Sequence, residues 1–327
     1  MKKNPFCLFH ATNSDWQLLS RTEFANALQT RQGDFQTCVL EIGLAPRANL
    51  AAVLVRGQVI NIYSLGPAPS RLDTGDLFSV LPNKRSTLRV RVLALTPHTA
   101  RMVKILLEQP QDETATAIRP GQLEKAIEET GLQTAPGLAH ISWPSAQGLA
   151  LLPGGGQPAR HTLFIASNQI LHSAGSMTAL YGWKETRCKL KIYDSRNTSP
   201  AWDEYFLHHA FTWQVSHLFQ RFEELTGRLV VNTIVREMNF AASANGWNIT
   251  VSAHNITDQA VFSSPEQAGQ VYQRLLEIVL HQAEMVLGTE LFSMLLRESQ
   301  TRLHVPYRDV FERYKAANAP EKSPVAV

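Results

Sequence analysis

Cysteine is scarce in this 327-residue chain, and long apolar runs are missing. Cys7, Cys38 and Cys188 form no CxxC pair, so we expect neither a disulfide framework nor a zinc site, and a reducing compartment is favoured. No apolar stretch approaches the roughly 20 residues of a membrane span, and Asn4-Pro5 interrupts the start where a signal peptide needs an apolar run. The sequence therefore predicts a cytoplasmic protein with no membrane span.

Motifs for catalysis and cofactor binding are also absent from the sequence. The glycine-rich segment 152–158 lacks the Lys-Ser/Thr of a phosphate loop, and a strand pattern follows it instead of a helix. Ser173 and Ser176 lie in no GxSxG elbow, and Cys188 falls on the inward side of a strand pattern, which favours a structural thiol. We therefore expect no cofactor and no enzymatic activity.

Charge is distributed unevenly along the chain, although its net value is only +3. Residues 1–200 carry 21 Lys and Arg against 14 Asp and Glu, which is +7, whereas residues 201–327 carry 10 against 14, which is −4. Two parts of opposite sign suggest two surfaces with different partners. The alternative is that charge simply drifts between domains.

An internal repeat is the main feature that the sequence does contain. Each copy has a helix, two or three strands, a short second helix and a closing basic strand. The best alignment matches residues 53–60 with residues 163–171, with one residue inserted. In the first copy, Arg56-Gly57-Gln58 separates two apolar triplets and predicts a tight hairpin turn.

The sequence predicts an α+β fold with two duplicated small α/β modules of antiparallel strands and a mainly α-helical C-terminal domain. The expected boundaries are 1–110 and 118–196 for the modules, 200–318 for the helical domain and 319–327 for a disordered tail. In the first module, 97–108 is expected to be a helix with Met102, Ile105 and Leu106 inward. The segment 108–117 is the expected linker.

Long helices are expected after the break at 197–200. The pattern predicts helices over 202–225 and 229–244, then a strand over 247–251 paired with 260–262. Ser264-Pro265 is typical of a helix start, and the helix that follows to about residue 287 is apolar around much of its circumference. Such a helix must be buried on more than one side.

The second module resembles the PATAN-type domain of bacterial regulatory proteins. The likeness lies in the hairpin 162–174, which ends Ile-Leu-His-Ser-Ala, and in 179–190, where a helix ending in aromatic residues precedes the closing strand. The first module is similar through 77–81 and 88–92. This resemblance implies regulation by protein–protein contact, alongside response regulators and motility systems, and implies no chemistry.

The closing strands suggest a basic binding surface. Alternation places their basic side chains opposite the apolar ones, although such residues also protect strands from edge pairing. Aromatic residues of the 202–225 helix are a second candidate interface, with an intradomain core against the 267–287 helix as the alternative. The predicted partner-binding residues are Lys84, Arg85, Arg89, Arg91, Lys184, Arg187, Lys189, Lys191, Phe211, Trp213 and Phe219.

Metal binding is the remaining chemical hypothesis. Glu204 and His208, and likewise Glu277 and His281, are spaced i, i+4 on expected helices, so two such pairs on facing helices would offer metal ligands. Solvated or capping roles explain the same spacing, and the sequence assigns no metal site.

The function predicted from the sequence is a non-enzymatic bacterial signalling and regulatory adaptor. Its partner would be a protein such as a response regulator or small GTPase, with self-association through the helical domain as a further expectation. The alternatives are a nucleic-acid-binding regulator that uses the basic strands and a metal-dependent hydrolase.

Overall fold

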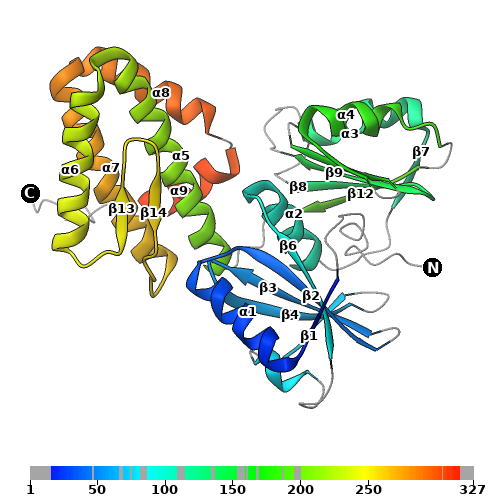
Figure 1. The fold of residues 1–327 in the computed structure, drawn as a ribbon. Coiled ribbons are helices and arrows are strands. Elements are labelled where there is room, and N and C mark those ends of the chain that lie inside the picture. Colours follow the sequence, from blue (N-terminus) through cyan, green and yellow to red (C-terminus); the bar gives the residue numbers. More distant parts are fainter. Residues whose placement is uncertain are drawn as a thin grey trace, which may run out of the picture. The chain divides into compact units, whose positions relative to one another are not determined.

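The computed structural model describes residues 16–45, 48–65, 69–73, 76–81, 87–108, 115–133, 137–152, 159, 161–166, 169–185, 188–194, 200–303 and 305–316. The chain divides into two compact units, residues 1–198 and 199–327 (Figure 1). The tail predicted to be disordered, residues 319–327, lies outside the described residues. Within them, no helix has the length and apolar character needed to cross a membrane.

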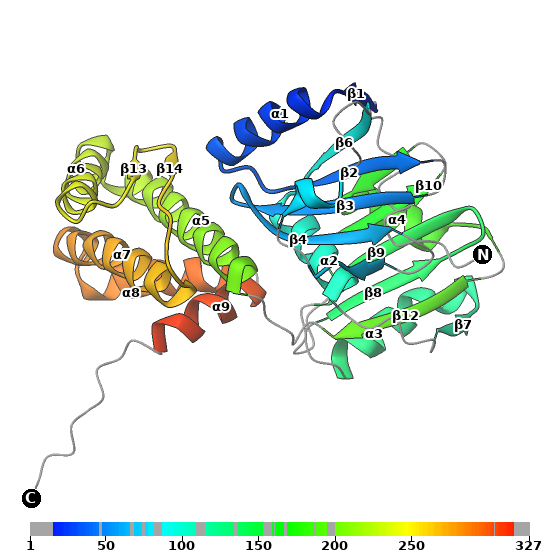
Figure 2. The same ribbon diagram turned by 90° about the horizontal axis from the view of Figure 1, so that it is seen from below.

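The first sheet has six strands in the order β1-β6-β2-β3-β4-β5, and every neighbouring pair is antiparallel. Figure 2 shows β2, β3 and β4 side by side. One face packs against α1 through Phe24 and Leu28. The elements of this module are β1 (Gln17–Leu19), α1 (Arg21–Gly33), β2 (Cys38–Ala45), β3 (Ala48–Val55), β4 (Gln58–Leu65), β5 (Pro69–Arg71), the 3-10 turn η2 (Leu77–Ser79) and β6 (Leu88–Ala94).

The second sheet has the order β7-β12-β8-β9-β10-β11, again antiparallel throughout. Leu123 and Ile127 of α3 and Leu180 of α4 pack on one of its faces (Figure 1). Its elements are β7 (Thr116–Ile118), η3 (Pro120–Gln122), α3 (Leu123–Gln133), β8 (Gly137–Ser142), β9 (Ala146–Leu152), β10 (Thr162–Ala166), β11 (Gln169–His172), α4 (Ser173–Gly182) and β12 (Cys188–Asp194).

The two sheets have one topology. If β1 to β6 are matched in order with β7 to β12, both strand orders become identical, with the closing strand between the first and second strands. A helix follows the first strand in each copy (α1, α3), and a short helical segment precedes the closing strand (η2, α4). The structure thus contains the expected duplication, and the predicted α+β class is confirmed.

The sequence alignment of the two copies was displaced by one strand. It matched the β3–β4 hairpin, residues 53–60, with the β10–β11 hairpin, residues 163–171, whereas β3 corresponds to β9. The error has a simple origin, because consecutive hairpins of a meander share the pattern of apolar strand, short turn and apolar strand. Local pattern alone does not say which hairpin is which.

The predicted tight turn between β3 and β4 is confirmed. Arg56 and Gly57 form a two-residue connection with φ values of 47° and 77°, as in the type I′ turns that match strand twist. The Gly57 N–H donates to the Gln36 carbonyl oxygen at 2.8 Å. A Cβ atom on Gly57 would lie 2.4 Å from the Gln32 carbonyl oxygen at the end of α1.

Helix α2 (Pro97–Glu108) follows the first sheet in sequence but contacts β8, β9 and β12 of the second. The predicted inward residues Met102, Ile105 and Leu106 are buried, and so are Arg101 and Lys104. Burial of cationic and apolar sides alike means that α2 is covered around its circumference. Helix α2 therefore follows β6 of the first sheet in the chain and packs against the second sheet.

The helical unit is arranged around α5 (Pro200–Thr226), which contacts every other helix of this unit in the described residues. The remaining elements are α6 (Arg228–Ala244), β13 (Ile249–Val251), β14 (Ile256–Asp258), α7 (Pro265–Leu287), α8 (Thr289–Arg302) and α9 (Val305–Ala316). The Ser264 hydroxyl accepts from the Gln267 N–H with Pro265 in the first turn, as the sequence predicted.

The predicted partner of the short strand in this unit was wrong. Residues 249–251 pair with 256–258 and not with 260–262. A tight turn closes this hairpin, where the Ser252 N–H donates to the Asn255 carbonyl oxygen at 2.8 Å. The side chain of Asn239 on α6 also bonds both the N–H and the carbonyl of Val251 at 2.8 Å. Ala260 and Phe262 are buried outside any strand.

We expect Gly57→Ala to destabilise the first module by on the order of 2–3 kcal/mol. Both the positive φ and the approach to Gln32 oppose a Cβ atom. Gly246→Ala is the matched control, because Gly246 has a φ of 70° but nothing within 4 Å of the added atom. Urea unfolding measures both variants, and an equal loss in the two would show that contact with α1 does not matter.

Candidate interaction surface

The structure separates the basic residues that the sequence grouped together. Lys84, Arg85 and Arg187 lie outside the described residues. Arg89, Lys184 and Lys189 are exposed, and Lys191 is half-buried. The prediction that Arg91 faces solvent is wrong, because it is only 5% exposed.

Arg91 is buried in an ion pair with Glu41, its direct cross-strand neighbour on β2. The guanidinium donates to one carboxylate oxygen of Glu41, and Asn49 on β3 donates to the other at 3.0 Å. The ring of Trp16 lies 4.9 Å from the Arg91 guanidinium and 5.0 Å from that of Arg89. Arg91 therefore lies on the face of the sheet opposite α1, where it is buried and not available to a partner.

The second module places another polar set at the equivalent positions. His140 on β8 pairs with Lys191 on β12, as Glu41 pairs with Arg91. Nε2 of His140 lies 3.3 Å from Oε1 of Gln147 on β9, in the position that Asn49 holds in the first module. The Lys191 ammonium also lies 4.8 Å from the Tyr193 ring centre. The duplication thus extends to a three-strand polar set, with a carboxylate in one copy and an imidazole in the other.

Glu41→Ala should cost about 3–5 kcal/mol of unfolding free energy, because it leaves the buried Arg91 without its carboxylate. Arg89→Ala, on the same strand but exposed, should cost less than about 1 kcal/mol. Urea unfolding at neutral pH compares the two. Equal small losses would contradict the structural role assigned to the pair.

Two of the three aromatic residues predicted at an interface belong to the core of the helical unit. Phe211 and Phe219 are fully buried, and Phe211 stacks on Tyr272 of α7 with ring centres 4.8 Å apart. Their assignment as partner-binding residues is therefore wrong, and the intradomain alternative is right. Trp213 is half-buried and stacks on His217, one turn along α5.

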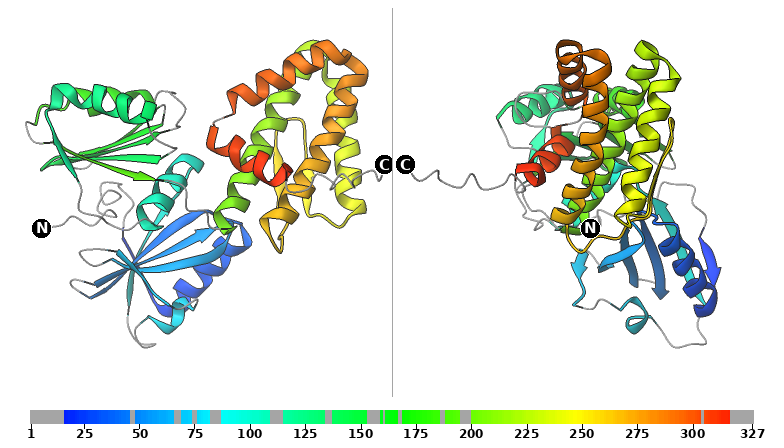
Figure 3. Two further views of the ribbon diagram at one scale, coloured as in Figure 1. Left: turned by 180° about the vertical axis from the view of Figure 1, so that it is seen from behind. Right: turned by 90° about the vertical axis from the view of Figure 1, so that its left-hand side faces the viewer.

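Five exposed apolar side chains of the helical unit lie at one of its ends, whereas Phe240 and Val261 are exposed elsewhere. Leu229 is 80% exposed, Met294 63% and Met285 60%, and Leu225 and Val286 are about half exposed. They flank the α5–α6 turn and the α7–α8 turn, which lie at the same end of this unit (Figure 3). We call these five residues the apolar end.

Polar contacts between the helices support this placement. The Gln282 side chain of α7 donates to Glu237 of α6 at 2.7 Å, and Arg221 of α5 lies 3.8 Å from Glu298 of α8. Both helix pairs run antiparallel. In an antiparallel pair, one residue forward on one helix corresponds to one residue back on the other. The start of α6 is therefore close to the level of the end of α7, and Leu225 is level with Met294.

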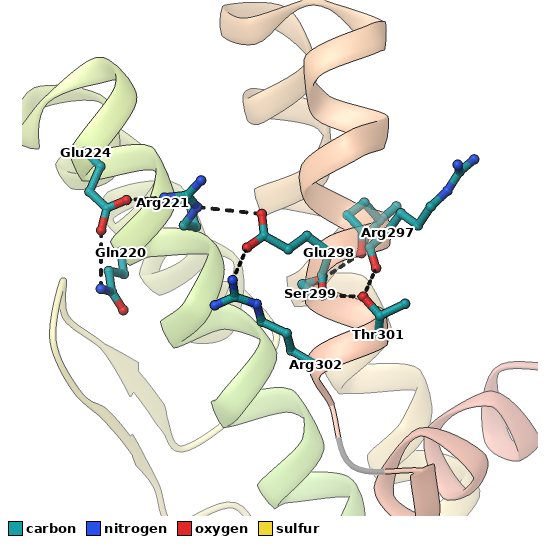
Figure 4. Close-up of polar contacts among 9 residues, drawn as sticks. Gln220, Arg221, Glu224, Arg297, Glu298, Ser299, Thr301 and Arg302 are labelled. Atoms are coloured by element: carbon teal, nitrogen blue, oxygen red, sulfur yellow. Dashed lines mark hydrogen bonds and ion pairs between the residues drawn. The ribbon is translucent and has the colours of Figure 1, made fainter. Parts of the chain in front are cut away.

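An ion-pair network fixes α8 against α5 just below the apolar end (Figure 4). Arg221 contacts both Glu224 and Glu298, and Glu298 also pairs with Arg302 at 2.7 Å. Networks of this kind hold geometry better than isolated surface pairs. The contact between Arg221 and Glu298 lies one turn from Leu225 on α5 and one turn from Met294 on α8.

Sequence reasoning missed the apolar end because each of its residues is unremarkable alone. Leu225 and Leu229 lie on either side of the turn at Gly227, and Met285, Val286 and Met294 lie around Gly288. One signal was available in the sequence. Apolar residues are more frequent at these two helix ends than a connecting turn requires. Recognising it required knowing that the two turns adjoin.

Of the two histidines in the metal hypothesis, His281 is exposed and His208 makes a structural contact. Nδ1 of His208 lies 2.8 Å from the buried carboxylate of Asp258, to which the Tyr272 hydroxyl donates at 2.6 Å. This cluster connects α5, the β13–β14 hairpin and α7. Among the described residues, no three His, Cys, Asp or Glu side chains lie close enough together to hold a metal ion.

The described cysteines have the environment of structural thiols. Cys188 is buried on the inner side of β12, as the sequence predicted, and Cys38 is buried on β2. Burial raises the pKa of both thiols to about 11. Neither is therefore present as a nucleophilic thiolate at neutral pH.

Comparison with protein-family models, with curated proteins and with solved structures finds no match to this chain. The PATAN-type resemblance therefore stays a prediction.

Two half-buried histidines, His140 and His209, should make stability depend on pH. Burial lowers the pKa of His140 and of His209 to about 4, whereas an unfolded histidine titrates near 6.5. The unfolded state thus binds protons first, and stability should fall from about pH 6.5 to about pH 4, by up to ~1.4 kcal/mol per pH unit for each histidine. Urea unfolding across this range should show a smaller fall for His140→Gln than for the wild type, and an unchanged slope would contradict the assignment.

Proposed function

We propose that this protein is a non-enzymatic regulatory adaptor that binds another protein through the apolar end of its helical unit. The observation that carries the proposal is the gathering of Leu225, Leu229, Met285, Val286 and Met294, all exposed, at one end of the unit. Single exposed apolar residues are normal on any protein. Several at one place mark an interaction site.

The energetic argument concerns what a partner would cover. Burying a leucine, valine or methionine side chain contributes roughly 1.5–3 kcal/mol. A few such side chains are enough to dominate an interface, because binding energy concentrates in a small number of residues. Leu229 is the most exposed of the five and is therefore the residue whose replacement should weaken binding most.

The rest of the helical unit provides a rigid base for this surface. Phe211, Phe219 and Tyr272 fill its interior, and the Arg221–Glu298–Arg302 network holds α5 and α8 in register. A surface presented by rigid elements loses little conformational freedom on binding. The two turns are therefore suited to serve as a preformed docking site.

The sheet modules offer further contacts for an acidic partner, through fewer basic residues than the sequence predicted. Arg89, Lys184 and Lys189 are exposed and stay in this proposal, whereas Arg91 is excluded by its burial against Glu41. A chain with one basic and one apolar surface could connect two proteins, as an adaptor does. Because Arg91 is not part of the exposed basic surface, the nucleic-acid alternative, which needs a continuous basic face, is also less favoured.

The test compares tagged full-length wild type with Leu229→Asp in quantitative capture from native lysate. We expect a protein bound by the wild type to be reduced at least about tenfold, as for a central interface residue. Phe240→Asp is the matched control, because Phe240 is 75% exposed on the same helix but lies three turns from the apolar end. Loss of the same protein from both variants, or from neither, would overturn the proposal.

A further inference from the structure

The apolar end has an acidic border. Glu223 and Glu224 lie in the last turn of α5, Glu284 in the last turn of α7 and Glu290 in the first turn of α8. The basic residues within one turn of the apolar end are Arg221, Arg228 and Arg297, of which Arg221 and Arg228 are paired with glutamates. All four glutamates lie within one turn of a residue of the apolar end. A partner that covers this end must therefore meet negative charge around its apolar contact.

Ion pairs neutralise only part of that charge. Arg228 lies 3.2 Å from Glu223, and Glu224 pairs with Arg221. Glu284 accepts a hydrogen bond from the Thr289 hydroxyl at 3.2 Å. In the described part of the chain, neither Glu284 nor Glu290 contacts a cationic side chain, and both are exposed. These two carboxylates therefore keep their negative charge for a partner.

We infer that the occupant of the apolar end is a basic amphipathic helix of a partner protein. Its apolar stripe would cover Leu229, Met285 and Met294, and flanking Lys or Arg residues would reach Glu284 and Glu290. Methionine side chains are flexible and polarisable, and they adapt to the apolar face of a bound helix. This inference rests on the proposed function and adds the chemistry of the partner.

Other occupants fit the surface less well. A second copy of the chain in a symmetric contact would bring the same glutamates against each other, and like charges repel. An anionic membrane would meet the same repulsion. An added β-strand needs an open sheet edge, and this end is formed by helices.

The first experiment uses a labelled helix-forming peptide of about 18 residues, with Leu at i, i+3, i+4 and i+7 and Lys elsewhere, titrated with the full-length protein by fluorescence anisotropy. We expect binding that weakens with salt. The same peptide with Glu in place of Lys should bind at least about tenfold more weakly. Equal binding of the two peptides would overturn the inference.

Variants locate the contact on the protein. Glu284→Gln combined with Glu290→Gln should weaken binding of the Lys peptide several-fold, and Leu229→Asp should weaken it further. Glu277→Gln is the control, because Glu277 is exposed on the same helix two turns before Glu284. An equal effect of Glu277→Gln would mean diffuse attraction to an acidic protein and would also overturn the inference.

The outcomes separate this inference from the proposed function. If Leu229→Asp removes the lysate partner but the glutamine variants leave both that partner and the peptide unaffected, the adaptor function stands and the basic helix is rejected. If Leu229→Asp leaves the lysate partner in place, the proposed function itself fails. Sedimentation that shows a dimer of the wild type, lost in Leu229→Asp, would identify a second copy as the occupant and reject the basic helix.

Discussion

The first unit depends on the insertion of the last strand of each module between its first and second strands. In both modules, the closing strand pairs on one side with the first strand and on the other with the second. Neither sheet is continuous until this strand arrives, and the buried pair that spans β2 and β6 joins residues 50 positions apart in the sequence. The chain must lose the entropy of closing a large loop before the contacts of the closing strand can form.

The same constraint explains why the duplicated polar sets lie where they do. Glu41 with Arg91, and His140 with Lys191, occupy the junction between the second and the closing strand. The Glu41–Arg91 ion pair forms only in the correct register, because a shift by one residue would turn each side chain to the other face. The two copies use different chemistry, a carboxylate and a neutral imidazole, at the same structural position.

The helical unit solves a different problem, which is to present apolar residues at its surface without losing its own packing. Phe211, Phe219 and Tyr272 remain inside, and the apolar end lies at the α5–α6 turn, the α7–α8 turn and the start of α8. Turn residues contribute little to the core, so their side chains are available for binding. In the proposed interaction, the acidic border would select among partners by charge.

Local features of this protein were determined by the sequence alone. The helix start at Ser264-Pro265 and the turn at Arg56-Gly57 depend on neighbouring residues, and the structure confirms both. The alternation of exposure in the first closing strand holds from Leu88 to Val90 and fails at Arg91, which is buried. The repeat was also visible in the sequence, although the alignment of its two copies was displaced by one strand. The tertiary structure alone decided the burial of Arg91, Phe211 and Phe219 and the exposure of the apolar end. Exposure depends on which distant element covers a face, and periodicity along the chain carries no information about that element.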